Sequence, residues 1–139
     1  MTGTIAETAQ SEPAPRRPRA TRALLVTVLG IHAAAAVGQP FLAGAYLSGN
    51  VDAIDVHSVS GFMLSLVCLV QLVVAVLFWR PGGGPLWPVW ATAVLFLAES
   101  VQIGMGFVRA LAVHVPLGVA IVGAAVAMFW WSLVWRPAR

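Results

Sequence analysis

The stretch that decides the fold is residues 54–79, IDVHSVSGFMLSLVCLVQLVVAVLFW, which holds one charged side chain, Asp55, near its start. About 20 apolar residues are enough to cross a lipid bilayer as a helix, so this stretch predicts a transmembrane span. Three more apolar segments of similar length lie at residues 23–47, 86–108 and 111–135. Short connections between them make successive helices antiparallel. The sequence therefore predicts an all-α membrane protein, a four-transmembrane-helix bundle running up, down, up and down.

The composition supports this class. Of 139 residues, 60% are hydrophobic and 9% are charged, whereas soluble domains carry about 25% charged residues. Too few polar side chains are present to cover a soluble surface, which excludes a cytosolic enzyme, a disordered protein and a soluble nucleic-acid binder. We expect residues 1–20 to form a disordered basic tail and residues 21–139 to form one transmembrane domain.

The distribution of arginine predicts the orientation of the bundle. With both termini in the cytoplasm, Arg109 is the one arginine on the outside, and the other seven lie inside. The excess of positive charge on the cytoplasmic side favours this topology, and tryptophans near the inner ends of the helices agree with it. The expected location is the plasma membrane, in bacteria the inner membrane. The first segment also resembles a signal peptide, but its apolar character continues through Phe41 and Tyr46, which favours a retained span.

Two of the three histidines carry the strongest indication of function. His57 and His114 lie about one turn below the outer ends of the second and fourth segments, so their rings are expected at matching depth. Each is followed four residues later by a glycine, Gly61 or Gly118, which lies on the same helix face. Two facing imidazoles beside glycine-lined space are typical of bis-histidine haem ligation. We therefore predict one haem b site with His57 and His114 as iron ligands.

Other polar residues within the spans have less specific interpretations. Gln39, Glu99 and Gln102 are expected near the haem, where side chains tune a cofactor through hydrogen bonds. Glu99 could equally handle protons or form a structural hydrogen bond. His32 lies too deep to share the iron and is expected to hydrogen-bond another helix. Cys68 is interpreted as a small packing residue.

A resemblance rests on these residues. Four helices with His57, Gly61, His114 and Gly118 near one end resemble one half of a haem A synthase. The segment GQPFLAG at residues 38–44, followed by both histidines, is similar to a family of small uncharacterised bacterial four-helix integral membrane proteins. The resemblance implies a fold rather than an activity. The synthases have two such halves, whereas this chain has one. It also lacks a glutamate at the position of the synthases' acidic residue, for which Asp55 is the nearest candidate. Synthase activity is therefore not expected.

The resulting prediction is a cytochrome-like membrane protein that serves electron transfer or haem handling, with a redox partner or a homodimer as candidate assemblies. Whether it is an enzyme stays open. The alternative is a cofactor-free structural or accessory protein, or a subunit of a larger complex. A proton-coupled carrier that uses Glu99 and His32 is a third, weaker hypothesis, because the four short spans contain no broken helices.

Overall fold

The computed structural model describes residues 17–136. It contains four helices: α1 (Arg17–Leu47), α2 (Ala53–Trp79), α3 (Trp87–Phe107) and α4 (Leu111–Val134). The described residues form no strand. All four helices are long and apolar enough to cross a membrane. The prediction of an all-α bundle of four transmembrane helices is confirmed, and the chain is an integral membrane protein.

The start of α1 differs from the sequence-based expectation. The helix begins at Arg17, so the last residues of the expected 1–20 tail are helical. Once the apolar span has formed, each further residue adds a hydrogen bond at little cost, and Pro18 is tolerated because the first turn needs no amide donor. Residues 1–16 lie outside the described part of the chain, as do residues 137–139.

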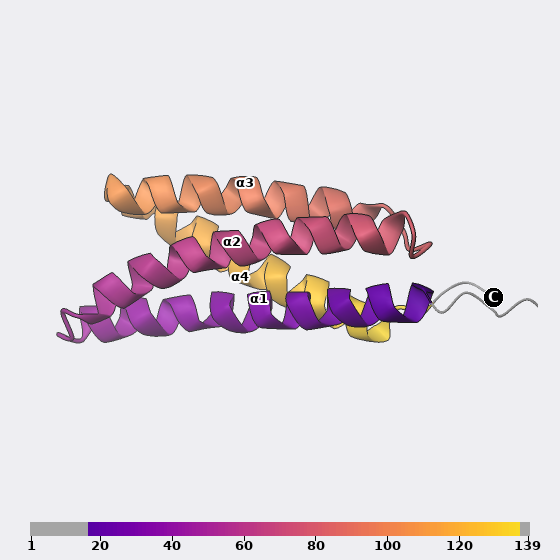
Figure 1. Cartoon of the computed structure of the whole chain (residues 1–139). Coiled ribbons are helices and arrows are strands. Elements are labelled where there is room, and N and C mark those ends of the chain that lie inside the picture. The colour runs from indigo at the N-terminus through magenta and orange to yellow at the C-terminus, as the bar shows by residue number, and fades with distance from the viewer. Residues whose placement is uncertain (1–16, 137–139) are drawn as a thin grey trace, which may run out of the picture.

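The helices pack in a closed ring of neighbours (Figure 1). α1 contacts α2 and α4, and α3 also contacts α2 and α4. Within the described residues no backbone contact joins α1 to α3 or α2 to α4, so these pairs are diagonal. The first residues of α1 and α3 therefore lie at the same end of the bundle as the last residues of α2 and α4. The opposite end carries the starts of α2 and α4, where His57 and His114 are placed.

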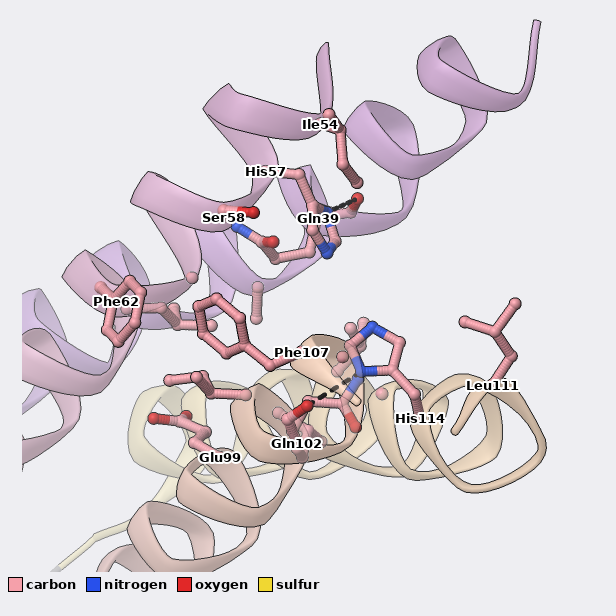
Figure 2. A pocket seen from close by; sticks show the side chains of 18 of the residues that line it. Gln39, Ile54, His57, Ser58, Phe62, Glu99, Gln102, Phe107, Leu111 and His114 are labelled. Atoms are coloured by element: carbon pink, nitrogen blue, oxygen red, sulfur yellow. Dashed lines mark hydrogen bonds between the residues drawn. The ribbon is translucent and has the colours of Figure 1, made fainter. Parts of the chain in front are cut away.

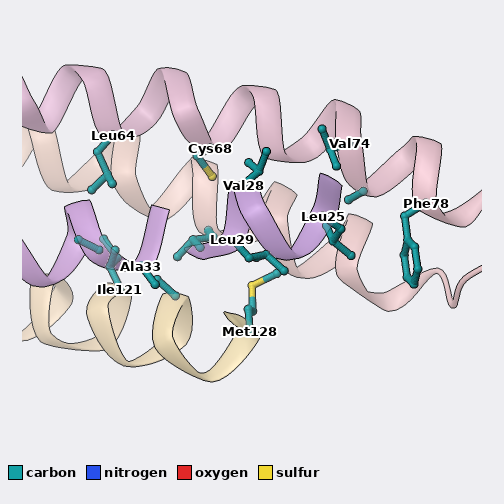
Figure 3. Packing of buried hydrophobic residues seen from close by; sticks show 14 residues of the cluster. Leu25, Val28, Leu29, Ala33, Leu64, Cys68, Val74, Phe78, Ile121 and Met128 are labelled. Atoms are coloured by element: carbon teal, nitrogen blue, oxygen red, sulfur yellow. The ribbon is translucent and has the colours of Figure 1, made fainter. Parts of the chain in front are cut away.

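Most of the buried hydrophobic cluster lies in the half of the bundle where α1 begins (Figure 3). Leu25, Leu29, Phe78 and Met128 are buried there among small residues of the neighbouring helices. The aromatic ring of Phe78 also contacts Trp135 at 5.1 Å between ring centroids. Lipid tails are as apolar as leucine, so helices in a bilayer associate through close packing and interhelical hydrogen bonds. This packed half holds the bundle together and leaves the other half free to enclose a site.

The loop between α2 and α3 depends on glycine. A side chain at Gly82 would collide with the backbone carbonyl of Phe78, and one at Gly84 would collide with the ring of the same residue. Gly83 has a φ of +67°, which L side chains rarely adopt. The loop can therefore fold back over the end of α2 only because it has no side chains there.

Candidate functional site

The two outer histidines face each other across the bundle. The ring of His57 on α2 and the ring of His114 on α4 have centroids 6.2 Å apart and planes inclined by 59°. Figure 2 shows both rings pointing toward one another from opposite sides of a cavity. The structure thus brings together two residues that are 57 positions apart in the sequence and lie on diagonal helices.

Each histidine is held by a backbone carbonyl of a neighbouring helix. His57 Nδ1 lies 3.2 Å from the carbonyl oxygen of Gln39 on α1. His114 Nδ1 lies 2.9 Å from the carbonyl oxygen of Gln102 on α3. Because a carbonyl oxygen only accepts, Nδ1 is the donor in both rings, and each neutral ring keeps its lone pair on Nε2. Both histidines are therefore oriented as metal-binding histidines usually are.

The two halves of the bundle repeat this arrangement. In the first hairpin, a glutamine carbonyl on α1 accepts from a histidine on α2, and in the second hairpin α3 and α4 do the same. The glycine that follows each histidine lies against the side chain of the same glutamine. A Cβ at Gly61 would lie 3.9 Å from Gln39 Oε1, and one at Gly118 would lie 2.7 Å from Gln102 Nε2. The glutamine, histidine and glycine of the first hairpin and those of the second therefore form a structural repeat.

A cavity of about 470 Å³ adjoins the histidine pair, and all four helices line it. A second cavity of about 250 Å³ also adjoins both histidines, between residues of α1 and α4. His57, His114, Gln39, Gln102 and Gly118 line both cavities. Both cavities thus adjoin the two imidazole rings.

Some lining residues were not identified from the sequence as members of a site. A Cβ at Gly106 would lie 3.0 Å from the His114 ring, so this glycine admits the ring. Phe62 and Phe107 contact each other on the cavity wall, with ring centroids 5.9 Å apart and planes inclined by 47°. Arg109 lies in the α3–α4 connection and also lines the cavity. Gly106 follows Gln102 at helical spacing, and that spacing is the sequence signal that could have found it.

A separate cluster of polar side chains lies deeper, where α1, α2 and α3 meet. His32 Nδ1 lies 2.8 Å from Gln71 Oε1, and His32 Nε2 lies 2.6 Å from Glu99 Oε1. Gln71 Nε2 donates to Thr92 Oγ1 at 3.0 Å. All four side chains are buried. We call His32, Cys68, Gln71, Thr92 and Glu99 the buried polar cluster.

The hydrogen bonds define where the protons of this cluster lie. Gln71 Oε1 only accepts, so His32 Nδ1 donates to it. A single proton then occupies the short bond between His32 Nε2 and Glu99 Oε1, carried either by the imidazole or by the carboxyl group. The second carboxyl oxygen of Glu99 is buried and has no hydrogen-bond partner. Glu99 also lines the larger cavity, so it connects the cluster to the space below the histidine pair.

The remaining candidate residues have these contacts. His32 does bond to other helices, through Gln71 on α2 and Glu99 on α3. Glu99 bonds to His32, and the side chain of Gln39 donates to Ser60 Oγ at 2.8 Å. Cys68 is buried, and its sulfur lies 3.8 Å from the backbone carbonyl of Thr92.

Comparisons of the chain with protein-family models, with curated proteins and with solved structures find no match.

Proposed function

We propose that the protein is a membrane cytochrome that binds one haem b between His57 and His114. The observation that carries this proposal is the facing pair of imidazoles, each anchored through Nδ1 and each with its Nε2 lone pair available. Haem iron commonly takes histidine as an axial ligand, and hydrogen bonds to such ligands tune its potential.

The spacing of the rings distinguishes a linear ligand pair from a tetrahedral one. An imidazole nitrogen binds a first-row metal at about 2.0 Å, and the ring centre lies about 1 Å farther out, so two trans imidazoles have centroids roughly 6 Å apart. Two ligands at a tetrahedral angle would bring the centroids to roughly 5 Å. The observed 6.2 Å agrees with the trans arrangement. The pair therefore fits a haem iron better than a zinc ion.

The surrounding space also fits a planar ligand. A macrocycle between the two imidazoles would need space beside them, and two cavities of about 470 and 250 Å³ adjoin both rings. Pockets for cofactors and drug-sized ligands are commonly about 300–1,000 Å³. Gly61 and Gly118 line the larger cavity below the histidines, where the side chains of Gln39 and Gln102 lie against them.

The place of Arg109 on the wall of the larger cavity would suit an anionic ligand. α1 and α3 both end with the same pair of turn hydrogen bonds. After α1, Gly49 N donates to Tyr46 O and Asn50 N donates to Ala45 O. After α3, Arg109 N donates to Gly106 O and Ala110 N donates to Met105 O. The residue that adopts positive φ is a glycine after α1 but Arg109 after α3. An L residue pays about 1–2 kcal/mol in this region. An arginine kept there, on the cavity wall, is well suited to pair with the carboxylates of a haem.

Bound haem would supply one-electron redox chemistry, and the chain would supply its ligands and surroundings. His57 and His114 would hold the iron, Gln39 and Gln102 would fix the orientations of the imidazole rings through their carbonyls, and Arg109 would balance anionic charge. A single site near one end of the bundle cannot carry electrons across the bilayer. We therefore propose electron transfer or haem handling at the outer face of the plasma membrane, with a redox partner or a second copy completing any longer path.

The test is the absorption spectrum of the detergent-purified protein, oxidised and then reduced with dithionite, after expression with added haem precursor. We expect near-stoichiometric haem with the sharp reduced bands of a six-coordinate low-spin b-type site. His57→Ala and His114→Ala should each abolish that spectrum, while His32→Ala, the matched control, should keep it.

Six-coordinate haem in either of the first two variants would refute the ligand assignment. A wild-type protein that stays colourless after incubation with haemin would favour the alternative, a cofactor-free accessory membrane protein. In that case the polar side chains would serve helix association alone.

A further inference from the structure

The buried polar cluster contains a group of side chains that the haem proposal does not use. His32, Cys68 and Glu99 come from α1, α2 and α3, and each offers one ligand atom, with all three atoms within 4.8 Å of one another. All three side chains are buried. We propose that these residues form a second site, which binds one divalent transition-metal ion of the zinc type inside the bundle.

The surroundings of His32 are those of a metal ligand. Its Nδ1 donates to Gln71 Oε1 at 2.8 Å, and Gln71 is in turn held by Thr92. Histidines that bind metals commonly donate their second ring nitrogen to an oxygen in this way, which fixes the ring and directs the other nitrogen at the ion. His32 Nε2 is accordingly directed at Glu99.

One carboxyl oxygen of Glu99 is free to act as a metal ligand beside His32 Nε2. Its Oε1 lies 2.6 Å from His32 Nε2, and its Oε2 is buried without a hydrogen-bond partner. Ligand bonds of about 2.0–2.2 Å in a tetrahedral site require the nitrogen and oxygen to separate by less than about 1 Å from this distance. Glu99 lines the larger cavity, so open space adjoins the side chain that would have to move.

Charge and ligand type select the ion. A thiolate, a carboxylate and a neutral imidazole carry two negative charges, so a divalent cation makes the buried site neutral overall. An isolated charge within the bilayer is costly, and neutrality removes most of that cost. Sulfur and imidazole ligands favour zinc and its neighbours over magnesium or calcium, which bind oxygen.

The larger cavity supplies a route for the ion. Glu99 lines this cavity together with His57 and His114, while Cys68 lies deeper, against the backbone of α3. An ion that enters between the outer histidines would therefore meet Glu99 first. The metal proposal does not depend on haem binding, because it uses none of the haem ligands.

The test is a titration of the metal-free, detergent-purified protein with Co²⁺, which reports a thiolate ligand by an intense sulfur-to-cobalt charge-transfer band. We expect one equivalent of Co²⁺ to produce this band and one equivalent of Zn²⁺ to displace it. Cys68→Ser, which changes the side chain by one atom, should abolish the band. Glu99→Gln should weaken binding by about 10-fold or more.

The matched control is the double variant His57→Ala with His114→Ala, which removes the outer histidine pair. It should bind Co²⁺ with the same band as the wild type, which separates this site from the proposed haem site. The proposal is overturned if the folded wild-type protein gives no thiolate band, if the band survives in Cys68→Ser, or if the double variant loses it. Failure of haem binding in the same preparation would leave the cobalt result unaffected, so the two proposals fail separately.

Discussion

Replacing His32 with leucine removes the side chain that joins three helices and leaves most of the volume filled. The substitution leaves Gln71 Oε1 and the Glu99 carboxyl group without their imidazole partner, and Glu99 Oε2 already has none. A buried polar group that loses its partner costs about 1–3 kcal/mol. Interhelical hydrogen bonds measured within membranes are weaker, about 0.6 kcal/mol on average and up to about 1.7. On this membrane scale, two lost bonds predict a loss of about 1–3 kcal/mol in the free energy of unfolding.

His57→Leu is the matched control, because the His57 ring makes one hydrogen bond and is half-buried, whereas the His32 ring makes two and is fully buried. The carbonyl oxygen of Gln39 that accepts from His57 belongs to a helix, and a carbonyl can also accept from the backbone. We expect His57→Leu to cost less than about 1 kcal/mol in haem-free protein, since a typical hydrogen bond contributes about 0.5–1.5 kcal/mol.

Reversible unfolding in mixed micelles of a mild detergent and dodecyl sulfate, followed by tryptophan fluorescence, measures both values. The six tryptophans supply the signal. Equal losses for the two variants, or a larger loss for His57→Leu, would show that the buried polar cluster does not hold the helices together.

Three further predictions concern the cavity and the topology. Gly118→Ala should reduce haem occupancy strongly, because its Cβ would lie 2.7 Å from Gln102 Nε2 and push that amide into the cavity. Gly61→Ala, with 3.9 Å to its nearest neighbour, should reduce occupancy less. Equal pigment content in the two purified variants would contradict this. Arg109→Gly should stabilise the haem-free fold by about 1 kcal/mol, since glycine adopts positive φ without strain, yet weaken haem binding in a haemin titration; unchanged affinity would remove Arg109 from the site. Asn50→Cys, in a chain whose native cysteine is replaced by serine, should react with a membrane-impermeant thiol reagent added to intact cells. Labelling only after lysis would show that the bundle has the opposite orientation in the membrane.

The site was only partly predictable from the sequence. The positions of His57 and His114 could be matched in depth by counting residues from the helix starts. Their hydrogen bonds to the Gln39 and Gln102 carbonyls could not be predicted, because every residue has a backbone carbonyl and the sequence does not indicate which one a side chain contacts. The pairing of His32 with Glu99, 67 residues away, was also not predictable.

The sequence by itself determined that the chain is a four-span membrane bundle, because span-length apolar segments and short connections leave few other arrangements. It also determined which polar residues lie within the spans, where placing a polar group in hydrocarbon costs free energy. Only the tertiary structure decided how each helix is rotated, and therefore which polar residues meet. The physical reason is that lipid and protein core are equally apolar. A transmembrane helix is hydrophobic on every side, and its buried face is selected by close packing and by hydrogen bonds such as those of His32.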